Sequence, residues 1–147
     1  RIKECSRLGD KISKKVTSKG KTFLLVSRTR EGKETWRDDA TGLLWGDTAE
    51  ERMNHADAQK FCTSDKAKAL YAGISDKKWG LPTKEDFETA EINGIREVLP
   101  NAKDKFFWSN TPHPQFANFA YDFNGSFGNV YHYVRNFNFF SVLCVGR

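Results

Sequence analysis

The chain has 147 residues, a length that favours one domain with a hydrophobic core of its own. No apolar run approaches the ~18 residues that a membrane-spanning helix requires, so we expect no membrane insertion. The net charge of +5 is unevenly distributed. Residues 1–33 hold eleven Lys/Arg and three Asp/Glu, whereas the remainder of the chain has a small excess of acidic residues.

The basic N-terminal segment has two interpretations. Residues 1–20 are rich in lysine and show little periodicity, so we predict a basic arm or stalk junction there and a folded domain over residues 21–147. The arm is either a solvated charged segment or a patch for an anionic partner such as a sulfated glycan or a phospholipid surface. Because no helix-turn-helix, zinc-finger or RNP-like motif is present, we expect no nucleic-acid partner.

The first half of the predicted domain combines strands with two helices. Residues 22–27 are β-branched and apolar, as is typical of a strand, and residues 36–45 contain turn residues between two apolar ends, which predicts a hairpin. Asn54 is a candidate N-cap for a first helix that ends at Gly73. Thr83 opens a second helix with a pattern that resembles a capping box.

The second half of the predicted domain is aromatic and rich in strands. Alternation over residues 117–123 predicts a strand, Asn124-Gly125 predicts a tight hairpin turn, and residues 126–133 form the returning strand. A terminal strand is predicted over residues 139–145. Two early helices and a late β-meander indicate an α+β domain.

Three cysteines are present: Cys5, Cys62 and Cys144. No CxxC pair occurs, so we predict no zinc site. Cys62 lies in the first predicted helix and Cys144 in the last predicted strand, and a bridge between them would close a loop of about 80 residues. Both could instead be buried free thiols in a reducing compartment. Cys5 lies in the basic arm and is either free or intermolecular.

Motifs for catalysis and metal binding are missing from the sequence. It contains no HExxH motif and no G-x-S-x-G elbow. We therefore predict that the protein is not an enzyme and that it needs no metal and no cofactor. The histidines are interpreted as surface or cap residues, and His113 is singled out because it lies between two prolines in a predicted exposed loop: His55, His113 and His132.

Six segments, in this order, resemble one family: WRDDATGLLW, Phe61-Cys62, WGLPTKEDF, FFWSNTP, YDFNGSFGNVYHY and LCVGR. From about Trp36 to Arg147 the chain is similar to the Lcl C-terminal domain family, named for the C-terminal domain of the Legionella collagen-like protein. The resemblance implies a C-type-lectin-like fold, with two helices packed on a twisted antiparallel sheet and a long irregular loop region. It also implies a disulfide between Cys62 and Cys144.

The resemblance further implies an extracellular or cell-surface module of bacteria at the tip of a fibre or stalk. The collagen-like member is a trimeric adhesin that binds sulfated glycosaminoglycans. Its specificity does not transfer directly, because the positive charge of this chain lies largely outside the similar region. Residues 111–115 also lack the carboxylates of a calcium-dependent sugar site, and the cysteine pair of the related formylglycine-generating enzymes is missing.

With catalysis and metal binding excluded, the remaining interpretation of the sequence is a binding surface. Residues 127–140 contain more aromatic side chains than an alternating strand can bury, so some of them either bind a sugar or pack in a trimer. Alternation places Tyr131, Tyr133 and Arg135 on one face. The predicted ligand-binding residues are Asn110, His113, Gln115, Tyr131, Tyr133, Arg135, Asn136 and Asn138.

We therefore predict a secreted or cell-surface adhesin-type domain that binds a glycan or another cell-surface ligand, with an anionic ligand as one option. We expect it to be a homotrimer. The alternative is a structural trimerisation cap of a surface fibre with no ligand of its own.

Overall fold

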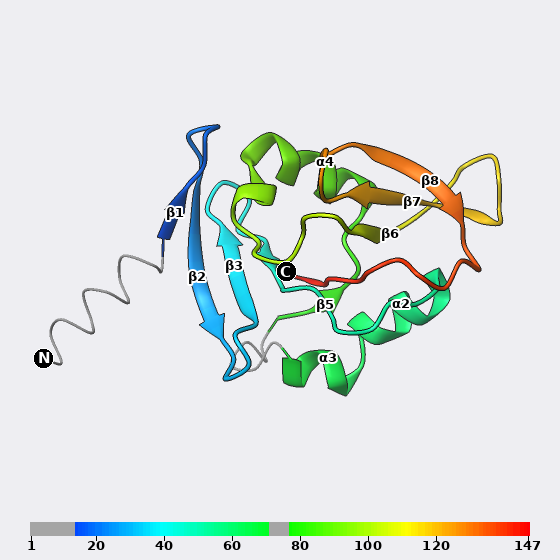
Figure 1. Ribbon diagram of the computed structural model, residues 1–147, viewed down its shortest axis with the longest axis horizontal. Helices are drawn as coiled ribbons and strands as arrows, with labels where there is room; N and C mark the ends of the chain where they lie inside the picture. Colours follow the sequence, from blue (N-terminus) through cyan, green and yellow to red (C-terminus); the bar gives the residue numbers. More distant parts are fainter. Residues whose placement is uncertain (1–13, 71–76) are drawn as a thin grey trace, which may run out of the picture.

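Two antiparallel sheets organise the chain in the computed structural model, which describes residues 14–70 and 77–147 (Figure 1). The larger sheet has six strands in the order β1-β2-β3-β4-β9-β5. Their bounds are β1 Lys14–Val16, β2 Thr22–Arg28, β3 Glu34–Asp38, β4 Leu44–Trp45, β9 Val145–Gly146 and β5 Trp79–Gly80. The predicted strand at residues 22–27 and the predicted hairpin at residues 36–45 are both confirmed.

The smaller sheet has three strands in the order β6-β7-β8, with bounds Phe106–Pro112, Phe119–Asn124 and Val130–Val134. The predicted hairpin between β7 and β8 is present but its turn is longer than expected. Asn124 Oδ1 accepts from the backbone N–H groups of Ser126 and Phe127, and β8 begins only at Val130. A Cβ at Gly125 would collide with the Ala102 carbonyl, which explains the glycine. The domain is thus α+β, with two sheets rather than the single predicted sheet.

The first predicted helix is divided into two helices. Asn54 caps α2 (His55–Cys62) as predicted, because its Oδ1 accepts from the Asp57 N–H at 2.9 Å. The chain then breaks, and α3 (Asp65–Leu70) follows. The predicted end at Gly73 lies outside the described residues.

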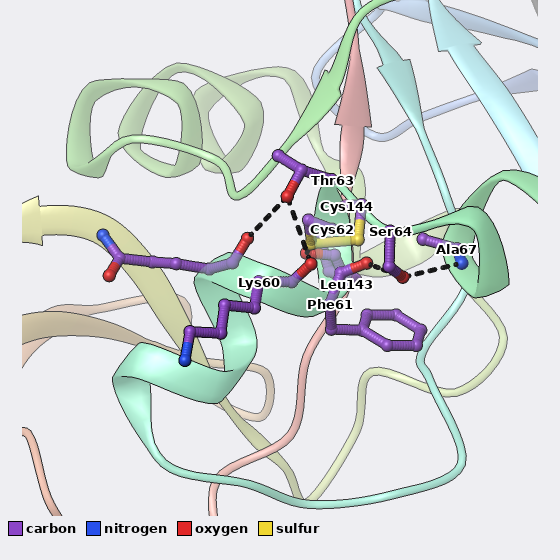
Figure 2. Close-up of a disulfide and its surroundings, with 9 residues drawn as sticks. Lys60, Phe61, Cys62, Thr63, Ser64, Ala67, Leu143 and Cys144 are labelled. Atoms are coloured by element: carbon purple, nitrogen blue, oxygen red, sulfur yellow. Dashed lines mark hydrogen bonds between the residues drawn. A yellow bond between two sulfur atoms is a disulfide. The ribbon is translucent and has the colours of Figure 1, made fainter.

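A serine accounts for the break. Ser64 Oγ donates to the Phe61 carbonyl at 2.6 Å and accepts from the Ala67 N–H at 3.2 Å, so it ends one helix and begins the next (Figure 2). The change of direction buries Ala67 and leaves Asp65 and Ala69 exposed, although in one continuous helix the spacing of these two residues would place them on the same face as Cys62.

The second predicted helix, α4 (Lys84–Asn93), is confirmed with its capping box between Thr83 and Asp86. Gly94 ends it at φ 91°, a left-handed conformation that glycine tolerates best. A 3-10 turn, η1 (Ile95–Glu97), follows.

Part of the predicted basic arm packs on the domain. Thr17 Oγ1 donates to the Asn93 carbonyl at 2.8 Å, and Lys15 Nζ donates to the Val98 carbonyl at 2.9 Å. Lys15 Nζ also lies 4.8 Å from the centre of the Trp36 ring. Residues 1–13, and with them Cys5, lie outside the described residues.

Two clusters of buried side chains form the core. One packs the larger sheet against α4 and the smaller sheet, with Phe87 stacked on Phe123 at 4.7 Å between ring centres. The other surrounds Trp108 and the disulfide. Aromatic residues of this fold are expected in the core, and Trp36, Trp45 and Trp79 are buried there, whereas Phe106 is 44% exposed.

The disulfide between Cys62 and Cys144 is confirmed (Figure 2). It joins the last residue of α2 to the residue before β9 and spans 82 positions of sequence. Both cysteines are fully buried. The bridge therefore fixes the C-terminal end of α2 to the residue that precedes β9.

Replacing both cysteines with alanine should destabilise the domain by about 4–5 kcal/mol on the chain-entropy account of disulfides. Urea denaturation would measure the loss, with Cys5→Ser as the control that leaves stability unchanged. Mass mapping of a non-reduced digest should identify a peptide that joins Cys62 to Cys144. A bridge that contains Cys5 would contradict the pairing.

Candidate ligand-binding site

A pocket of about 360 Å³, with asparagine and arginine as four of its seven lining residues, lies where the N-terminus of α2 meets the start of β7 and the end of β8. Three of its residues are asparagines and one is an arginine. Its lining consists of Asn54, Ala56, Ala117, Asn118, Val134, Arg135 and Asn136. Backbone hydrogen bonds hold its three walls together: Arg135 N–H donates to the Asn118 carbonyl at 2.8 Å, and His55 N–H donates to the Arg135 carbonyl at 3.0 Å.

Arg135 is fixed in this pocket by a buried histidine. Its Nε donates to Nδ1 of His55 at 3.0 Å, and its Nη1 donates to the Ala117 carbonyl at 3.3 Å. Because a guanidinium has no acceptor atom, Nδ1 must be the accepting nitrogen of the ring. A neutral His55 then carries its proton on Nε2, which lies 2.8 Å from the Ser109 carbonyl and donates to it.

The surroundings of His55 keep its ring neutral. The side chain is fully buried, and its ring lies edge-on to Trp108 at 5.3 Å. Burial lowers the pKa of His55 below its ordinary value of 6.5, and the charge of Arg135 lowers it further, while the hydrogen bond to Ser109 acts in the opposite direction. The prediction that His55 is a surface or cap residue is therefore wrong, since this histidine belongs to the core.

The eight predicted ligand residues fall in three places. Arg135 and Asn136 line the pocket, and Asn138 lies beside it, where its Oδ1 accepts from Nδ2 of Asn54 at 3.1 Å. Tyr131 and Tyr133 are exposed, and they share a face of β8 as predicted.

The remaining three predicted residues lie away from the pocket lining. Asn110 belongs to β6 rather than to a loop, and its side chain accepts from Gln59 at 2.9 Å. His113 is half-buried, and its Nδ1 accepts from the N–H groups of Gln115 and Phe116. Its ring packs against Phe116, Tyr121 and His132. His113 therefore organises its own loop.

Sequence reasoning missed Asn54 and Asn118 as pocket residues. Asn54 was recognised only as a helix cap, and its second role comes from the amide nitrogen that the cap leaves free to reach Asn138. Asn118 precedes β7 and belongs to a pattern of alternation, which says nothing of a pocket. The one sequence signal for these pocket residues is the frequency of asparagine just before β7 and just after β8.

A second hollow, of about 310 Å³, is mainly apolar and lies beside α2 and α3, where Met53, Phe61 and Leu70 contribute to its wall. It adjoins Leu70, the last residue described before position 77, so we base no site on it. Among the described residues, no group of three or more His, Cys, Asp or Glu side chains is arranged to hold a metal ion. None of the helices in residues 14–70 and 77–147 has the length and apolar character needed to cross a membrane.

Comparison with models of known families identifies the family of this chain. The family model described as Lcl C-terminal domain matches residues 34–146, which include both sheets except β1 and β2. The chain belongs to the Lcl C-terminal domain family. No curated protein matches the chain. The match includes the pocket and the disulfide, and membership points to a domain of a surface protein.

This Lcl C-terminal domain also contains an isolated buried carboxylate. Asp122, in the middle of β7, is 3% exposed, and no hydrogen bond or ion pair joins its carboxylate to another described residue. Burial raises the pKa of Asp122 from 3.8 to about 6. The folded state thus favours the protonated form, so the stability that this residue contributes is complete below pH 4 and is lost as the pH rises through 6.

Arg135→Ala should destabilise the domain by about 1–3 kcal/mol, because it leaves the buried Nδ1 of His55 without a donor. The depressed pKa of His55 means that the contribution of its neutral ring is present above pH 6.5 and is lost as the pH falls. Urea denaturation at pH 7.5 would measure the effect against Arg30→Ala, an exposed arginine. Equal stability of the two variants would contradict the hydrogen bond.

Asp122→Asn should stabilise the domain at pH 7.5 by about 2–3 kcal/mol, because the variant has no charge to bury. The gain should shrink towards zero near pH 4, where Asp122 is protonated. Denaturation curves at several pH values would show this, with the exposed Asp57→Asn as the matched control. A gain that is independent of pH would show that the carboxylate is not the cause.

Proposed function

We propose that this domain is a non-catalytic, extracellular binding module of the adhesin type, with a C-type-lectin-like fold, that recognises a glycan or another surface ligand. The pocket around Arg135 is the observation that carries the proposal. Its volume is in the range of small-ligand pockets, which begins at roughly 300 Å³. We assign the ligand contacts to Arg135, Asn136 and Asn118.

The chemistry of the pocket suits a sugar. Amide side chains offer both donors and acceptors, and a sugar hydroxyl needs both. Asn118 and Asn136 are exposed, and no hydrogen bond to a described residue occupies their side-chain amides. Arg135 donates hydrogen bonds from Nε to His55 and from Nη1 to the Ala117 carbonyl, so its Nη2 is available for a ligand. A sugar hydroxyl or an anionic substituent can accept from it.

Exposed aromatic rings near the pocket give further support. Tyr131 and Tyr133 are 63% and 42% exposed, and Tyr133 lies two residues from Arg135. Tyrosine rings supply large contact areas at a low cost in side-chain entropy, as in antibody binding sites. We propose that they extend the contact surface beyond the pocket.

The proposed location is outside the cell, either secreted or on the bacterial surface. The buried disulfide supports this location, because disulfides persist in oxidising compartments. We further propose a homotrimer. Exposed aromatic side chains, including Phe139 at 59%, favour an interface between copies. A trimerisation cap without a ligand is the second candidate function.

A glycan array with the purified domain tests the proposal. Once a glycan is bound, Asn118→Ala and Asn136→Ala should each weaken binding by roughly fivefold or more, with little change in the melting temperature, because neither side chain packs in the core. The control is the double charge reversal Lys19→Glu with Lys21→Glu in the basic segment. Loss of binding in the control alone would place the ligand on the arm.

A trimerisation cap without a ligand would give different results in these experiments. Light scattering would show a stable trimer, and the array would show no bound glycan. A stable monomer that binds a glycan would exclude the cap.

A further inference from the structure

The isolated carboxylate of Asp122 is buried on an aromatic face of the smaller sheet. In the strand register, Asp122 is opposite Trp108 of β6 and Tyr131 of β8. Residues directly opposite one another, and residues two positions along a strand, share a face of the sheet. Phe106, opposite Asn124, and Tyr133, opposite Ala120, therefore belong to the same face as Asp122.

Aromatic rings enclose this part of the face. Phe140 stacks on Phe106 at 5.5 Å and lies 5.1 Å from the ring centre of Tyr133. Phe106, Tyr131 and Tyr133 are all at least 42% exposed, so their rings reach the surface, whereas Asp122 on the same face is buried. Helix α4 packs on the other face of the smaller sheet, where Phe87 stacks on Phe123 and Lys84 lies over the ring of Tyr121.

No cation of the described chain compensates Asp122. Lys84 faces Tyr121 and Glu88, and Arg52 lies over Phe139, but neither pairs with this carboxylate. An ionised carboxylate in an apolar environment is costly unless a cation or hydrogen-bond donors accompany it. The fold buries this carboxylate on the same face as three exposed aromatic rings, an arrangement that a bound cation would stabilise.

The surroundings select an organic cation over a metal ion. Calcium and magnesium require several oxygen ligands, and Asp122 is not part of any acidic cluster in residues 14–70 and 77–147. The faces of aromatic rings attract ammonium groups and favour those that carry alkyl substituents. One carboxylate among phenylalanine and tyrosine rings therefore matches an alkylammonium group.

We propose that the face formed by Asp122, Phe106, Tyr131, Tyr133 and Phe140 is a binding site for an alkylammonium group. The carboxylate neutralises the cation, and the rings contact its carbon atoms. Tyr131 and Tyr133 lie at the surface, where a ligand can reach their rings. This site shares Tyr131 and Tyr133 with the proposed glycan surface, but its charge is opposite in sign to that of the Arg135 pocket, so it does not depend on the glycan proposal.

An NMR titration tests the site at pH 7.5, where Asp122 is ionised. The probes are choline chloride and Nα-acetyl-lysine methylamide, and sodium chloride at equal ionic strength is the baseline. We expect saturable shifts of the ring signals of Phe106, Tyr131 and Tyr133 with at least one probe. Tighter binding of choline would indicate a small quaternary ammonium ligand, and tighter binding of the lysine analogue would indicate a protein side chain.

The variants make the test specific. Asp122→Asn should weaken the binding about tenfold or more, and Tyr131→Leu should weaken it severalfold. The matched control Asp57→Asn, on the exposed side of α2, should bind as the wild type does. Asn118→Ala should also bind normally, which separates this site from the glycan pocket. The absence of a saturable shift with either probe, or equal binding by Asp122→Asn, would overturn the proposal.

Discussion

A buried imidazole connects the three segments on which the candidate pocket depends. His55 begins α2, its Nε2 donates to Ser109 in β6, and its Nδ1 accepts from Arg135, which follows β8. Each of these contacts spans at least 54 positions of sequence. Because both ring nitrogens are hydrogen-bonded, the imidazole fixes the positions of these segments relative to one another and holds the side chain of Arg135 in place.

The disulfide and the aromatic core supply the rigidity behind this arrangement. The bridge fixes the C-terminal end of α2 to the segment before β9, while His55 fixes its N-terminal end against the smaller sheet. An eight-residue helix would be marginal alone, so these two anchors decide its position. Two ionisable side chains then lie on the smaller sheet and its edge. Arg135 is hydrogen-bonded to His55, whereas Asp122 has no hydrogen bond or ion pair with a described residue.

Patterns of neighbouring residues predicted the helices and strands more successfully than the residues of the candidate pocket. The capping box at Thr83 and the Asn54 cap depend on neighbouring residues, so the sequence alone indicated them correctly. The helix break at Ser64 interrupts a good apolar pattern, so the pattern alone predicted one continuous helix. Alternation placed Tyr131 and Tyr133 on the right face, but it could not reveal that Arg135 bonds to a residue 80 positions away.

The claim that His55 holds Arg135 in place is tested most directly by 15N NMR of the histidine ring in the intact domain. At pH 7.5 we predict a neutral ring with its proton on Nε2, and a scalar coupling across the hydrogen bond from the Nε–H of Arg135 to Nδ1 of His55. A proton on Nδ1, or a doubly protonated ring at this pH, would contradict the account, because neither form can accept the hydrogen bond from Arg135.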